Sequence, residues 1–223
     1  MLKSLRTIFY TELLLLARRR EEWLYPIAFF VIVISMLPFA FSPDPAILRT
    51  LVPGGIWISA LFACMLSMET IFKTEKEEGT LQQWIISSIP VPFLVLAKIS
   101  AQWFCTMLPL ILLTPLICWL LQLSHDAIIV LTASLLFGTP VLTLLASFGA
   151  ALTSGLRQQG VMLNLLILPL AAPILIFGVN MVLQTSAGFS ARGPLMLLAG
   201  ICLLSLFCLP FAAAEALKLG EDD

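Results

Sequence analysis

The stretch LVPGGIWISALFACMLSMETIFKTEKEEGTLQQW, residues 51–84, joins a long apolar segment to a short charged one. Residues 51–68 are almost continuously apolar, and their number is close to what a helix needs to cross a bilayer. Residues 74–78 then carry three glutamates and one lysine, and Gly79 follows. The stretch predicts a membrane-spanning helix that leads into a polar element outside the bilayer.

The whole chain has the composition of a membrane protein. Of its 223 residues, 60% are hydrophobic and only 11% are charged, whereas a soluble domain carries about 25% charged residues. Several spans of about 20 residues leave too little chain for a soluble catalytic domain. The formal net charge of -1, with no basic stripe, argues against a nucleic-acid partner.

Six apolar segments are each long enough to span a bilayer as a helix. They are continuously apolar and do not alternate with a period of two, which favours helices over a β-barrel. We therefore predict an all-α integral membrane fold with six transmembrane helices. The predicted spans are residues 23–41, 51–68, 95–121, 128–152, 161–183 and 194–217.

The basic residues are distributed unequally between the two sides of the predicted membrane. One side has only Arg49 and Arg192, in short loops at about residues 42–50, 122–127 and 184–193. Because basic loops stay in the cytoplasm, the sequence predicts that both termini are cytoplasmic. The basic residues on the cytoplasmic side are Lys3, Arg6, Arg18, Arg19, Arg20, Lys73, Lys76, Lys98, Arg157 and Lys218.

The first 22 residues lack the pattern of a cleavable signal peptide. Their spacing predicts an amphipathic helix in the cytoplasmic interface, and the alternative is a basic tail without a defined face. We divide the chain into this interfacial helix at 1–22, a permease domain at 23–217 and a cytoplasmic tail at 218–223. The apolar face of the helix would consist of Leu5, Ile8, Phe9, Leu13 and Leu16.

The charged segment after the second span predicts a helical extension into the cytoplasm. Glu69 and Lys73, and then Lys73 and Glu77, are spaced four residues apart, as in pairs that support a helix. This helix would end at Glu78. Gly79 would follow as a cap in the left-handed conformation, which glycine adopts without steric cost.

A second short helix is predicted to follow the glycine. Thr80 would be its N-cap, and Gln83 three residues later would complete a capping box. Leu81, Trp84 and Ile85 would form its apolar face, and Pro90 and Pro92 would end it. The loop as a whole covers about residues 70–92. It is either a docking element for a cytoplasmic partner or an anchor in the membrane interface.

Sequence motifs for catalysis are lacking. There is no P-loop, no HExxH, no GxSxG and no pair of carboxylates within a span, so we predict neither an enzyme nor a metal site. His125 is the only histidine and lies beside Asp126 in a predicted outer loop. A solvated side chain and a haem contact are the two interpretations of His125. No charge lies at mid-membrane depth, which argues against an ion-driven carrier.

The segment EKEEGTLQQWIISSIPVPFLVLAK, residues 75–98, resembles the E…GTLE…L…P…K segment of ABC-2-type exporter permeases. A glutamine at Gln82 or Gln83, where many permeases have glutamate, departs mildly from this pattern. Over nearly the full length the chain resembles the haem-exporter B (CcmB) family of the cytochrome c maturation ABC transporter. Further stretches that carry the resemblance are FYTELLLLARRREEW (9–23), FFVIVISMLPFAFSPDP (29–45), LLFGTPVLTLLASFGAALTSGLRQQG (135–160) and LLSLFCLPFAAAEALK (203–218).

The resemblance implies a permease subunit in the bacterial inner membrane, with haem as the handled ligand and ATP used by a partner. The implied partners are a cytoplasmic ABC ATPase, a multi-spanning haem-handling subunit, a small single-span subunit, a periplasmic haem chaperone and a second copy of the chain. It also implies ATPase docking at Glu77, Glu78, Gly79, Thr80, Leu81 and Trp84.

Three hypotheses of function remain after the resemblance. In the first, the chain couples a partner ATPase to haem transfer or to release of the haem-loaded chaperone. In the second, it is a membrane scaffold of the haem-handling complex that transports nothing itself. In the third, it is an intramembrane enzyme, which would require a clustered acid, base or nucleophile. The haem-binding residues remain unknown in all three.

Overall fold

The computed structural model describes residues 2–40, 45–77, 79–81, 84, 89–154 and 159–219. Over these residues the chain is helical and contains no strand. The helices, in chain order, are α1 (Leu2–Arg18), α2 (Arg20–Ala40), α3 (Pro45–Met68), α4 (Lys73–Glu77), α6 (Val91–Leu120), α7 (His125–Thr153), α8 (Gln159–Ser186) and α9 (Arg192–Leu219).

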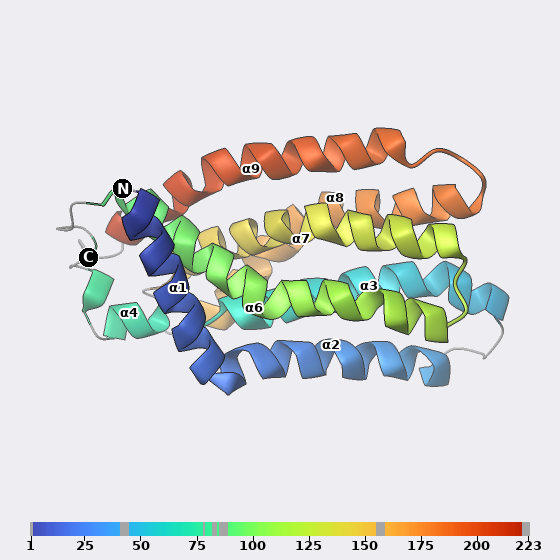
Figure 1. The fold of residues 1–223 in the computed structure, drawn as a ribbon, viewed down its shortest axis with the longest axis horizontal. Helices are drawn as coiled ribbons and strands as arrows, with labels where there is room; N and C mark the ends of the chain where they lie inside the picture. The colour runs from blue at the N-terminus through green and yellow to red at the C-terminus, as the bar shows by residue number, and fades with distance from the viewer. Residues whose placement is uncertain are drawn as a thin grey trace.

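Six of the helices are long and apolar enough to cross a membrane, which confirms the predicted fold class. They are α2, α3, α6, α7, α8 and α9, and they lie side by side as one bundle (Figure 1). Both chain termini and α4 lie at one end of the bundle, here called the terminal end. The connections from α2 to α3, from α6 to α7 and from α8 to α9 lie at the opposite end, here called the far end.

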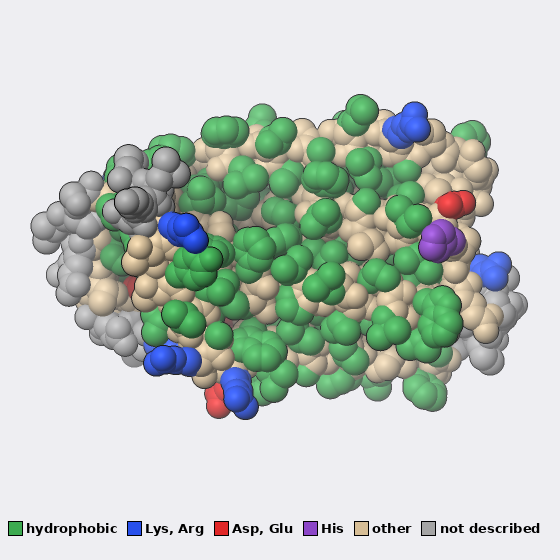
Figure 2. Space-filling view, viewed as in Figure 1, with side chains coloured by type: hydrophobic (Ala, Val, Ile, Leu, Met, Phe, Trp, Pro, Cys, Tyr) green, Lys and Arg blue, Asp and Glu red, His purple; other side chains and the backbone are tan. Residues whose placement is uncertain are grey.

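The surface of the bundle is apolar, as expected for a chain with lipid as its solvent. In Figure 2 hydrophobic side chains cover the middle of the visible face, and the charged side chains on that face lie near the two ends. Phe39, Leu112 and Phe207 are among the large apolar side chains on the outside. Because exposed apolar area of this extent is unfavourable in water, the protein is a multi-pass membrane protein.

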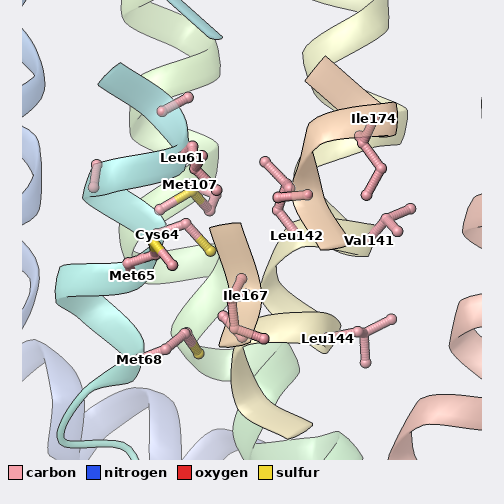
Figure 3. Close-up of a cluster of buried hydrophobic side chains, with 14 of the residues drawn as sticks. Leu61, Cys64, Met65, Met68, Met107, Val141, Leu142, Leu144, Ile167 and Ile174 are labelled. Carbon is pink, nitrogen blue, oxygen red and sulfur yellow. The ribbon is translucent and has the colours of Figure 1, made fainter. Parts of the chain in front are cut away.

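Helix α7 is the centre of the bundle. It packs against α3, α6, α8 and α9, whereas α2 lies at the periphery and packs mainly against α3. Figure 3 shows part of the core, which includes Leu61 and Met65 of α3, Met107 of α6, Leu142 of α7 and Ile167 of α8. Close packing of this kind is what holds helices together when lipid is as apolar as the core.

Small residues allow α3, α7 and α8 to approach closely. The fully buried indole of Trp57 on α3 occupies the space where a Cβ atom on Gly138 of α7 or Gly178 of α8 would lie. A Cβ atom on Gly149 of α7 would be 2.7 Å from Cδ1 of Ile167. Substitution of these glycines would therefore force the helices apart.

The predicted extension of the second span as a continuous helix is wrong. Helix α3 ends at Met68, residues 69–72 form turns, and α4 is a separate short helix. The turns allow both Ile71 and Phe72 to be buried in the core, where Phe72 is fully inaccessible. Burial of these two apolar side chains stabilises the turn and offsets the helical hydrogen bonds that the chain gives up there.

Other boundaries differ from the predictions by a few residues. Helix α2 begins at Arg20 and not at 23, since Glu21 and Glu22 occupy its first turn, where acidic side chains favour a helix N-terminus. Helix α6 begins at Val91 and not at 95, and it includes Pro92 in its first turn, a position that tolerates proline.

Candidate docking and coupling site at the terminal end

Helix α1 lies against the bundle at the terminal end, where it packs mainly on α6 (Figure 1). Its less exposed face includes Ile8, Phe9, Leu13 and Leu16, in agreement with the predicted apolar face. The side chain of Leu5 lies outside the described residues. The ring of Phe9 meets Phe104 of α6 edge-on with a centroid distance of 5.7 Å. The apolar face of α1 therefore packs on protein.

The connection after α4 contains the predicted left-handed glycine. Gly79 has a φ of 69°, and its backbone N–H donates to the carbonyl oxygen of Lys76 at 3.3 Å. Thr80 Oγ1 donates to the carbonyl oxygen of Glu75 at 3.2 Å. The threonine hydroxyl therefore bonds back to α4. Gln83, its predicted capping-box partner, lies outside the described residues.

The apolar side chains of the predicted docking segment turn toward the bundle. Leu81 is buried in the core, and the half-buried Trp84 packs against it. These contacts hold the end of the segment to the protein. Glu78 and the side chain of Glu77 lie outside the described residues, so the structure does not place those two predicted docking groups. Ile85, which was predicted for the apolar face of the short helix, also lies outside them.

Trp84 also lines a groove at the terminal end. The groove has a volume of about 260 Å³ and lies between α1, Trp84 and the start of α6. Its polar side chains come from α1, and Leu94 of α6 lies on the other side. The described residues that line it are Thr7, Ile8, Thr11, Glu12, Trp84 and Leu94.

A buried cluster of charged side chains adjoins this groove. Lys98 of α6 donates a hydrogen bond to Glu75 Oε1 of α4, and its Nζ atom is 3.5 Å from Glu12 Oε2 of α1. The three side chains are only 11%, 13% and 18% exposed, for Lys98, Glu75 and Glu12 respectively. The cluster joins α4 and α6 to α1, which is far from both in the sequence.

This cluster was not predicted from the sequence. Lys98 counted there among the basic residues that set the membrane orientation, and Glu75 and Lys98 begin and end the segment that resembles ABC-2-type permeases. Glu12 is four residues from Ile8 and four from Leu16, and therefore lies on the apolar face of α1. An acidic residue on an apolar face is a signal for a buried partner, because an unpaired buried charge is strongly unfavourable. Sequence alone could not identify that partner.

His125 lies at the far end, remote from the cluster. It is the first residue of α7 and is exposed, as is the neighbouring Asp126. Among the described residues no group of three His, Cys, Asp or Glu side chains is placed to hold a metal ion. Within the described part of the chain His125 therefore belongs to no such group of three.

Comparison with known proteins places the chain in a family. The model of the family described as "CcmB protein" matches residues 3–220. A protein named "Heme exporter protein B" from Pseudomonas aeruginosa is 45% identical over 208 residues, which are 93% of each chain. Its namesake from Rhodobacter capsulatus is 40% identical over 96% of this chain and 99% of the relative. The one from Haemophilus influenzae is 38% identical over 97% of this chain and 98% of the relative. Because the similarity extends over nearly the whole length, the chain belongs to the CcmB protein family.

Proposed function

We propose that the chain is the permease subunit of an ABC transporter complex for haem export in cytochrome c maturation. The observation that carries this proposal is the match to the CcmB family over residues 3–220, together with relatives named "Heme exporter protein B" of nearly the same length. The six apolar helices support it, since a permease needs several spans. The chain contains no P-loop sequence, so a partner subunit would hydrolyse ATP.

The terminal end is the proposed docking surface for the ATPase. In this proposal it faces the cytoplasm, in keeping with the excess of Lys and Arg that the sequence places there. Residues 77–84 contribute the contact, with Glu77 and Glu78 as charged groups and Trp84 as an anchor. The left-handed Gly79 and the buried Leu81 support this role, because both residues have a defined place in the structure. Residues that are already ordered lose less conformational entropy when a partner binds.

The remaining partners follow from the same family assignment. A multi-spanning haem-handling subunit and a small single-span subunit would pack against the apolar outer surface of the bundle, and a periplasmic chaperone would receive the haem. A second copy of the chain would complete the permease. We propose that the haem ligands belong to partners, because His125 is the only histidine of the chain and is exposed.

The test is co-purification of the tagged chain from membranes that contain the whole complex. We expect the ATPase to co-purify, haem to be present in the sample, and the rate of ATP hydrolysis to depend on the chain. Retention of the ATPase with a hydrolysis rate that is the same with and without the chain would favour the scaffold. Absence of the ATPase from a sample that holds the other subunits would contradict the permease proposal.

A further inference from the structure

We propose that Lys98, held between Glu75 and Glu12, is the positioning residue that transmits movement of α4 to the membrane-spanning helices. This inference rests on the proposed function, in which an ATPase docks next to α4. In it, one largely buried cation passes the movement that ATPase docking imposes on α4 to the membrane-spanning helices.

Helix α4 is short, spans only Lys73–Glu77 and follows the buried Ile71 and Phe72. The ion pair between Glu75 and Lys98 ties α4 directly to the first turns of α6. A movement of α4 would reach α6 through this pair as well as through the chain itself.

The same cation also reaches α1. The Nζ atom of Lys98 is 3.5 Å from Glu12 Oε2, and residues 12 and 98 are far apart in the sequence. Helix α1 packs on α6 and on the start of α2. Lys98 therefore lies where three elements meet, and a displacement at Glu75 changes the forces on both α6 and α1.

The cluster has more acceptors than its one cation satisfies. Glu75 Oε2 is buried and has no hydrogen-bond partner, while Glu75 Oε1 and Glu12 Oε2 both lie near the ammonium group. A lysine has a flexible stem and three donors, so its ammonium group can follow either carboxylate. A shift of α4 relative to α1 would change which carboxylate binds Lys98. The cluster therefore has two arrangements, one with Lys98 on Glu75 and one with Lys98 on Glu12.

The experiment uses the full complex reconstituted in lipid nanodiscs. The variants are Lys98→Met, which keeps the length of the stem, and Glu75→Gln, which weakens the same pair from the other side. Lys218→Met is the matched control, because it removes one positive charge at the same end of the bundle. Lys218 forms an exposed pair with Glu215. For each variant we measure ATPase retention, ATP hydrolysis and haem-loaded chaperone released per ATP hydrolysed.

We expect Lys98→Met and Glu75→Gln to retain the ATPase and to hydrolyse ATP, but to release about tenfold less haem-loaded chaperone per ATP. Lys218→Met should behave as the unmodified chain does. Normal release per ATP in both cluster variants would overturn the proposal. Loss of the ATPase from both would also overturn it, because the cluster would then serve docking. Failure of the unmodified chain to retain the ATPase contradicts the proposed function itself.

A charge exchange separates coupling from general stability. A Glu12→Gln background removes the carboxylate that would repel a glutamate at position 98. In this background the double change Glu75→Lys and Lys98→Glu restores the attraction, with the two charges exchanged. We expect this variant to release more chaperone per ATP than Lys98→Glu alone in the same background. Equal release by the two variants would contradict the role of the pair, because either orientation of the charges should transmit movement.

Discussion

The two ends of the bundle differ in whether they contain a largely buried pair of charged side chains. At the far end Arg49, His125 and Asp126 are exposed, and Arg49 Nε donates to the carbonyl oxygen of Gln122 at 3.1 Å. At the terminal end Lys98 and Glu75 are largely buried and depend on each other. An exposed ion has water as a partner, whereas a buried one needs protein groups. The comparison predicts that substitutions at the terminal end have the larger effects.

Accessibility from the two sides of the membrane gives the largest expected difference. A cysteine at Thr80 and a cysteine at Ser124 should react with an impermeant thiol reagent from opposite faces, because one span, α6, lies between the two positions. Labelling of intact cells and of inverted vesicles, with the unmodified chain as the control for its own cysteines, measures this. Labelling of both positions from the same face would contradict the six-span arrangement, and a cytoplasmic Ser124 would reverse the proposed orientation.

Two tryptophans provide the next comparison. Trp84→Ala removes the half-buried anchor of the terminal end, and such anchors contribute about 2 kcal/mol or more to binding, which is roughly thirtyfold in affinity. Trp119→Ala removes an exposed indole near the far end of α6. Affinity for the purified ATPase should fall only for Trp84→Ala, while both variants insert into the membrane normally. Equal affinities would show that the segment is only an interfacial anchor.

Two glycines with positive φ allow a smaller and closely matched comparison. Gly79 at the terminal end has a φ of 69°, Gly188 at the far end has a φ of 84°, and neither has an atom within 4 Å of an added Cβ. Valine at either site is strained by about 1 kcal/mol or more. We expect Gly79→Val to weaken ATPase retention about fivefold and Gly188→Val to leave it unchanged. A similar loss of ATPase retention in both variants would show that valine destabilises the protein in general and that Gly79 has no special role in docking.

The smallest effect is expected at His125. The side chain is exposed at the start of α7, and a single imidazole in such a place offers haem one axial bond and little apolar enclosure. His125→Ala should therefore leave the haem content of the purified complex nearly unchanged, as measured by absorbance of the pyridine haemochrome. A large loss of haem would show that His125, at the far end, contributes to haem binding.

Much of the fold could be predicted because its signals are local. Long apolar segments indicate spans wherever they occur, since the backbone must satisfy its own hydrogen bonds in lipid. The inward face of α1 and the left-handed Gly79 were also predictable, the first from residue spacing and the second from the conformations that glycine alone adopts freely. The docking residues remain a proposal, because several of them lie outside the described residues.

The sequence by itself therefore determined the six spans, the apolar face of α1 and the position of the turn at Gly79, because hydrophobicity and backbone preference act over a few residues. Only the tertiary structure decided that α3 ends at Met68, since burial of Phe72 depends on neighbouring helices. It alone also brought Glu12, Glu75 and Lys98 together. That pairing depends on how α1, α4 and α6 pack, and the free energy of a buried charge depends on the partners that packing supplies.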